Sequence, residues 1–215
     1  MILPRDSGDR IEAAVAKAEE HTSAELVVVG RPFSGSYRDV EYRFGLACAL
    51  AFLGWALYSE RTVPPAAVIP GLVTAWLLGW FLCRWSPHLR RLQTTPARRR
   101  RQAHDLARLT FLEQGVDGTS ARTGVLVHVS FLERAVDLIA DRGVGEVFSP
   151  QELAEMGEGL GDVLRRDGVD AFCEHLDGLG RQLGTKLPRS EDDVDELANA
   201  PVFHAHGGDG DGGAS

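Results

Sequence analysis

Two apolar runs, separated by a short polar step, constrain this chain more than any other feature. Neither the first run, residues 44–58, nor the second, residues 63–83, contains a charged side chain. The second has 21 residues, close to the ~20 that a helix needs to cross the hydrocarbon core of a bilayer. The first has 15. The sequence predicts a transmembrane helical hairpin over residues 44–83. The alternative is a helical hairpin buried in a soluble core.

Arginine side chains gather on the outer flanks of this hairpin, at positions 38, 43, 84, 90 and 91. The connection between the two runs holds Arg61 beside Glu60. Basic residues favour the cytoplasmic side of a membrane-spanning helix. We therefore expect a multi-pass protein of the cell inner membrane with both termini in the cytoplasm.

A block of four further arginines follows the second run: Arg98, Arg99, Arg100 and Arg101. Residues 84–112 hold eight basic residues and one acidic residue, whereas residues 113–215 hold eight basic and 21 acidic residues. A basic segment this close to a membrane exit is typical of attraction to anionic lipid headgroups. No aromatic residues are interleaved with it, so we expect membrane lipids as partners and no nucleic acid.

The remainder of the chain alternates helical and strand patterns. Helices are expected at residues 8–21, 96–114, 149–167 and 169–183, and strands at 24–29, 124–129 and 135–140. This order predicts an α/β fold, an α/β/α sandwich with a small central sheet that the hairpin interrupts. The predicted parts are the first helix and strand (1–43), the hairpin (44–83), the remainder of the domain (84–188) and an acidic, glycine-rich disordered tail (189–215).

Pairing between the first and second strands has a topological consequence. If residues 24–29 pair with residues 124–129, both ends of the hairpin must return to the same side of the bilayer. The three cysteines are too few for a disulfide framework, and two of them, Cys48 and Cys83, lie in the apolar runs. This usage indicates a reducing compartment.

Four charged residues near predicted strand ends are candidate catalytic groups: Glu25, Arg134, Asp141 and Arg142. We expect the last three to converge at the ends of the central strands, where α/β sheets usually carry their sites. The alternative is that they are ordinary turn residues and that Glu25 faces solvent. His128 is expected to be a packed strand residue. His204 and His206 lie in the tail, so no metal site is predicted.

The pattern resembles the TPM domain family, an α/β/α sandwich found in thylakoid-lumen and bacterial envelope proteins. The residues that carry the resemblance are Thr22–Val29, Gly124–Val127, Glu133–Leu138 and Ala140–Val144. The resemblance implies a range of activities. Some members act as acid phosphatases or bind calcium, and others take part in membrane-complex assembly or repair.

Two positions of this chain depart from the family pattern. Arg122 and Thr123 precede Gly124, where the family has an Asp-Asn pair, and Asp141 and Glu146 stand in a different setting from the family's acidic residues. The sequence therefore favours a non-catalytic binding or membrane-complex assembly module, with a membrane protein as partner and no cofactor. The alternative is a phosphatase-like hydrolase acting near the membrane surface, for which the family resemblance implies calcium.

Overall fold

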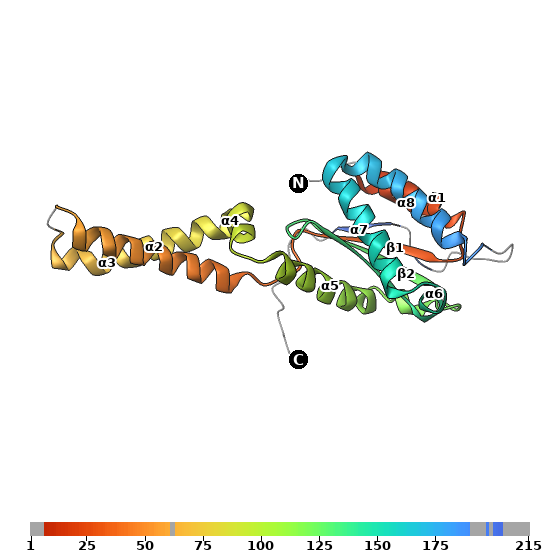
Figure 1. The fold of residues 1–215 in the computed structure, drawn as a ribbon, viewed down its shortest axis with the longest axis horizontal. Helices are drawn as coiled ribbons and strands as arrows, with labels where there is room; N and C mark the ends of the chain where they lie inside the picture. The colour runs from red at the N-terminus through yellow and green to blue at the C-terminus, as the bar shows by residue number, and fades with distance from the viewer. Residues whose placement is uncertain (1–6, 61–62, 190–196, 198–199, 204–215) are drawn as a thin grey trace. The chain divides into compact units, whose positions relative to one another are not determined.

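The computed structural model describes residues 7–60, 63–189, 197 and 200–203 (Figure 1). The chain divides into two compact units, one of residues 1–34 and 100–215 and the other of residues 35–99. We call the first the sheet domain and the second the hairpin unit. The hairpin unit is thus longer at both ends than the predicted hairpin, residues 44–83.

A four-stranded sheet forms the centre of the sheet domain. Its strands are β1 (Glu25–Arg31), β2 (Gly124–Ser130), β3 (Ala135–Ala140) and β4 (Val202–Phe203), in the spatial order β3-β2-β1-β4. β1 is parallel to β2 and to β4, and β2 is antiparallel to β3. The three predicted strands are confirmed. β1 and β2 are buried along almost their whole length, as expected for aliphatic, β-branched runs covered on both faces.

Helices cover both faces of this sheet. They are α1 (Ser7–Glu19), α5 (Pro96–Glu113), the 3-10 turn η1 (Val116–Gly118), α6 (Arg142–Val147), α7 (Pro150–Arg166) and α8 (Gly168–Gly184). Leu160 of α7 and Leu176 of α8 pack with Leu26 in one core, and Phe111 of α5 packs with Val27 on the other face. Figure 1 shows α1 and α8 on one side of the strands and α5 on the other. The predicted α/β/α sandwich is confirmed.

Side-chain caps set the starts of α6 and α7. Ser149 accepts a hydrogen bond from the backbone N–H of Glu152, whose carboxylate accepts one from the N–H of Ser149, so the sequence signature of a capping box is confirmed. Asp141 accepts a 2.7 Å hydrogen bond from the N–H of Arg142 and caps α6. The sequence predicts a turn here, because a helix of six residues has too short a periodic pattern to be recognised.

α7 lies against the edge strand β3, and glycines make this close approach possible. A Cβ added to Gly157 would lie 3.0 Å from the carbonyl oxygen of Val136, and one added to Gly161 would lie 3.5 Å from its nitrogen. Covering an edge strand with a helix protects it from pairing with another chain. The prediction that the third strand lies at an edge is confirmed.

The hairpin unit contains α2 (Arg38–Tyr58), α3 (Pro65–Trp85) and the short α4 (Pro87–Leu92), which the sequence did not predict. α2 has 21 residues rather than the 15 of the uncharged run, because it begins at Arg38. Both α2 and α3 are long and apolar enough to cross a membrane. In their most apolar 18-residue windows, 22% of α2 and 11% of α3 is buried, so the hairpin does not have the burial of a soluble core.

Most of the tail predicted to be disordered, including His204 and His206, lies outside the described residues. For Val202 and Phe203 the prediction is wrong, because they form β4 beside Val29 and Gly30. A Cβ on Gly30 would lie 2.5 Å from the ring of Phe203. The missing side chain of Gly30 therefore makes room for an aromatic ring that covers the strand.

Candidate functional site

β1 and β2 end side by side, and a hydrogen-bonded cluster lies at this end of the sheet. The hydroxyl of Ser130 donates to Oε2 of Glu133 at 2.5 Å, and the N–H of Ser34 donates to Oε1 at 3.0 Å. The hydroxyls of Ser34 and Ser130 also bond to each other. Glu133 is 7% exposed, and these partners compensate its burial. The cluster fastens the β2–β3 turn to the segment that follows β1.

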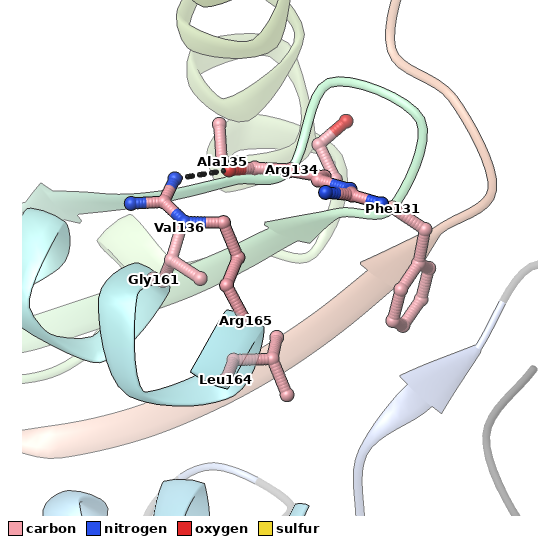
Figure 2. Close-up of a pocket in the computed structure, with 8 residues that line it drawn as sticks. Phe131, Arg134, Ala135, Val136, Gly161, Leu164 and Arg165 are labelled. Carbon is pink, nitrogen blue, oxygen red and sulfur yellow. Dashed lines mark hydrogen bonds between the residues drawn. The ribbon is translucent and has the colours of Figure 1, made fainter. Parts of the chain in front are cut away.

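A pocket of about 120 Å³ opens beside this turn, between β3 and α7. We call it the turn pocket. Its apolar lining comes from Phe131, Val136 and Leu164, and its cationic lining comes from Arg134 and Arg165. Figure 2 shows Arg165 reaching from α7 to the backbone of the turn, with Leu164 on the same helix. The pocket therefore combines an apolar wall with two guanidinium groups.

Arg134 has a left-handed backbone conformation, with φ of 54°. This conformation costs a residue other than glycine roughly 1–2 kcal/mol. The carbonyl of Arg134 accepts a 2.9 Å hydrogen bond from Nη1 of Arg165, and the Glu133 cluster holds the preceding residue. Together these contacts stabilise a strained turn whose arginine lines the pocket.

The other three predicted catalytic residues lie at the opposite end of the sheet. Glu25 pairs with Gly124 at the start of the parallel strands, and the N–H of Asp141 donates to the carbonyl of Gly124 at 2.9 Å. β3, six residues long, runs between Arg134 and Asp141, and at ~3.3 Å per residue it separates them by roughly 20 Å. The predicted convergence of Arg134, Asp141 and Arg142 is therefore wrong, because an antiparallel strand joins them.

Glu25 and Asp141 also have structural roles. Glu25 is 6% exposed, and its Oε2 accepts a hydrogen bond from the N–H of Leu197, so it does not face solvent. Asp141 caps α6, and Nη1 of Arg122 lies 3.8 Å from its other carboxylate oxygen. Arg142 is exposed on α6. These contacts agree with the alternative that Asp141 and Arg142 are turn and cap residues.

The four arginines predicted to contact the membrane surface, residues 98–101, differ in their contacts. Arg98 binds both carboxylate oxygens of Asp39 at 2.8 Å, and Arg99 donates to two backbone carbonyls of the hairpin unit. Arg100 pairs with Glu158 on α7. The side chains of Arg100 and Arg101 are 71% and 86% exposed. Arg98 and Arg99 hold local structure, and Arg100 and Arg101 remain the more accessible pair.

His128 is fully buried on β2, directly opposite Asp137 on β3, so its prediction as a packed strand residue is confirmed. Burial raises the pKa of Asp137, and the nearby His104 opposes this shift. Within the described part of the chain, no three His, Cys, Asp or Glu side chains are grouped so as to hold a metal ion.

Sequence reasoning identified Arg134 but missed Ser34, Ser130, Glu133 and Arg165. The available signal was the charged Glu133-Arg134 pair at a predicted strand end. Ser34 is far away in the sequence and is brought to the turn by the parallel pairing of β1 with β2. Arg165 belongs to the polar face of an amphipathic helix, where a charged residue gives no sign of a pocket.

No protein-family model and no curated protein sequence matches this chain. Among solved structures, the fold is similar to that of the BA42 protein from the psychrophilic bacterium Bizionia argentinensis, determined by NMR. The TM-score is 0.57 and the sequence identity 16%, over 95% of this chain and 97% of that one. At this identity the likeness shows the fold alone.

Proposed function

We propose that this chain is a membrane-anchored TPM-like domain that acts as a non-catalytic binding or membrane-complex assembly module on the cytoplasmic side of a bacterial inner membrane. The observation that carries the proposal is the exposed α2–α3 hairpin. Its two uncharged runs, residues 44–58 and 63–83, lie in the sequence between two strands that pair with each other. Its partners are membrane lipids and a membrane protein.

The surface of the hairpin supports a membrane environment. Leu50, Ile69 and Leu82 are more than half exposed, and the aromatic residues Tyr58 and Trp85 near the helix ends are 91% and 73% exposed. Apolar side chains in this number are costly in water, at ~25 cal/mol for each Å² of exposed apolar surface. Aromatic residues at helix ends are typical of the interface between membrane and water.

The packing between α2 and α3 supports the same environment. A Cβ on Gly79 would lie 2.7 Å from the sulfur of Cys48, and one on Gly45 would lie 2.8 Å from the carbonyl oxygen of Trp76. The helices therefore approach closely at small residues. Membrane helices commonly associate in this way, because lipid removes most of the hydrophobic driving force between them.

The arginines at the ends of the hairpin support a cytoplasmic orientation of both ends. Arg38 begins α2, and Arg84 lies in the last turn of α3. Oε1 of Glu41 lies 2.6 Å from Nη2 of Arg90, and Oε2 lies 3.6 Å from Nη1 of Arg84. These charged groups mark one end of the hairpin as its polar end, and the positive-inside rule assigns that end to the cytoplasm.

The geometry of the candidate residues favours binding over catalysis. A phosphatase-like hydrolase built from Glu25, Arg134 and Asp141 needs the three groups around one reacting phosphoryl group. Arg134 lies at one end of the sheet, and the two carboxylates lie at the other. Arg122 and Thr123 also stand where the TPM family has its acidic and amide pair.

Two measurements on the full chain test this proposal. Membranes from expressing cells are washed with alkaline carbonate, and the chain should stay in the membrane pellet; release into the supernatant would exclude a spanning anchor. The purified chain is then assayed with a chromogenic phosphate monoester, and we expect no turnover. Turnover that Arg134→Ala or Asp141→Asn abolishes would contradict a non-catalytic module.

A further inference from the structure

We propose that the turn pocket binds a phosphate group, carried either by an anionic lipid headgroup or by a soluble phosphate compound. The lipid source rests on the proposed membrane location, whereas the soluble source does not.

The charged side chains around the pocket are the first evidence for an anionic ligand. Arg134 and Arg165 both line it, and Arg165 pairs with Asp162, which lies 3.6 Å from Arg166 as well. Among the residues that the structure describes, the guanidinium of Arg134 makes no ion pair. Of the two arginines that line the pocket, Arg165 thus shares the carboxylate of Asp162 with Arg166, and Arg134 is not paired with a carboxylate of the described residues. An anion between them would relieve this imbalance, and phosphate oxygens match the planar fork of a guanidinium group.

The negative charge nearest the turn does not neutralise these arginines by pairing with them. Glu133 is nearly buried, and both of its carboxylate oxygens accept hydrogen bonds from Ser130 or Ser34. Arg165 uses one guanidinium nitrogen for the carbonyl of Arg134, which leaves its other nitrogens for Asp162 and a ligand. The pocket is therefore held in shape by bonds that do not depend on a bound anion.

The size and lining of the pocket limit the ligand. A volume of about 120 Å³ is well below the ~300–1,000 Å³ of sites that enclose drug-sized molecules. Phe131, Val136 and Leu164 supply an apolar wall beside the two arginines. This combination suits a phosphate group attached to a short aliphatic segment, as in the glycerol phosphate portion of a lipid.

The connection to the hairpin favours a headgroup as one source. Ser34 is the last residue of the sheet domain before the hairpin unit, and it is bonded to Ser130 and Glu133 of the turn. Three residues, 35–37, link it to the start of α2 at Arg38. The turn that carries Arg134 is therefore attached by a short connection to the proposed anchor.

The test uses the full chain in zwitterionic nanodiscs and isothermal titration calorimetry. One arm titrates a short-chain phosphatidylglycerol, and the other titrates inorganic phosphate. Arg134→Gln and Arg165→Gln should each weaken binding at least about tenfold, because a hydrogen bond to a charged group is removed. Arg134→Lys keeps the charge but loses the planar fork, and it should give an intermediate affinity even where Arg134→Gln folds poorly.

Two control variants are matched to the test variants. Arg122 also has a left-handed backbone conformation, with φ of 57°, and it lies at the opposite end of the sheet. Arg166 follows Arg165 on α7 and pairs with the same aspartate, but it does not line the pocket. Arg122→Gln and Arg166→Gln should bind both probes within about twofold of the unchanged chain.

Each outcome decides the proposal. Arg134-dependent binding of both probes supports recognition of the phosphate group itself, binding of the lipid alone supports a headgroup, and binding of inorganic phosphate alone supports a soluble compound. The proposal would be overturned if neither probe bound saturably. It would also be overturned if the control variants lost as much affinity as the Arg134 and Arg165 variants. Carbonate extraction separates this result from the proposed function. A chain that carbonate releases from the membrane but that still binds inorganic phosphate would contradict the membrane anchor and support phosphate binding by the pocket.

Discussion

Val27 and Leu126 lie side by side in parallel strands, although the whole α2–α3 hairpin falls between them in the sequence. Parallel neighbours need a crossover connection, usually a helix packed on the sheet. Here α5 is that helix, since Phe111 packs with Val27 and Leu126. The hairpin is therefore an insertion in the connection from β1 to α5, and the sheet domain closes without it.

The contact between α1 and α8 depends on a glycine. A Cβ on Gly180 would lie 2.3 Å from the carbonyl oxygen of Ala18, whereas nothing lies within 4 Å of a Cβ on Gly178. We expect Gly180→Ala to lower the free energy of unfolding by about 1–3 kcal/mol through overpacking. Gly178→Ala should raise it by about 0.5–1 kcal/mol through helix propensity. Chemical denaturation of the two variants checks this, and equal effects would contradict the packing.

Two glycines of the hairpin allow a second comparison between a packed and an unpacked position. A Cβ on Gly79 would meet Cys48, while one on Gly54 would meet nothing within 4 Å. We expect Gly79→Leu to separate α2 from α3 and to lower the thermal unfolding midpoint of the detergent-solubilised chain by several degrees. Gly54→Leu should leave the midpoint nearly unchanged. If Gly79→Leu is equally harmless, the close approach of the two helices is wrong.

Acid should weaken the start of α7. The hydrogen bond from Lys186, with further bonds from Ser149, lowers the pKa of Glu152 from 4.5 to about 2. Because the folded-state pKa is depressed, this contribution to stability is complete above about pH 4.5 and disappears as the pH falls toward 2. We expect Glu152→Gln to reduce the loss of stability across this window. Glu155→Gln, on the same helix, is the control for pH-dependent denaturation, and the same profile in both variants would exclude the role of Glu152.

The sandwich could be predicted from the sequence because its signals are local. The β-branched run of β1, the Ser149 capping box and the helical period of α8 each specify an element without distant partners. α4, α6 and β4 could not be predicted in this way. α4 and α6 are each six residues long, too short for a periodic pattern. β4 depends on the contact between the ring of Phe203 and Gly30, two residues that are far apart in the sequence.

The candidate site was less predictable, since it depends on contacts between segments that are far apart in the sequence. The sequence placed Arg134 and Asp141 at the two ends of one predicted strand, residues 135–140, and the expected convergence overlooked the ~20 Å that a strand of this length spans. The turn pocket also needs Arg165 from α7 and Ser34 from beyond β1, which tertiary structure brings to the same turn. Sequence spacing carries no information on such contacts.

The central claim is that the hairpin crosses the membrane and returns, and accessible cysteines test it most directly. Tyr58→Cys places a thiol at the end of α2, where the side chain is 91% exposed. Glu12→Cys places one on the exposed face of α1 in the sheet domain. Intact cells carrying each variant, and the unchanged chain as baseline, are treated with a membrane-impermeant maleimide.

We expect labelling of Tyr58→Cys in intact cells and labelling of Glu12→Cys only after the inner membrane is permeabilised. This result would place the connection of the hairpin on the far side of the membrane and the sheet domain in the cytoplasm. Labelling of Glu12→Cys in intact cells, or protection of Tyr58→Cys until permeabilisation, would contradict the account.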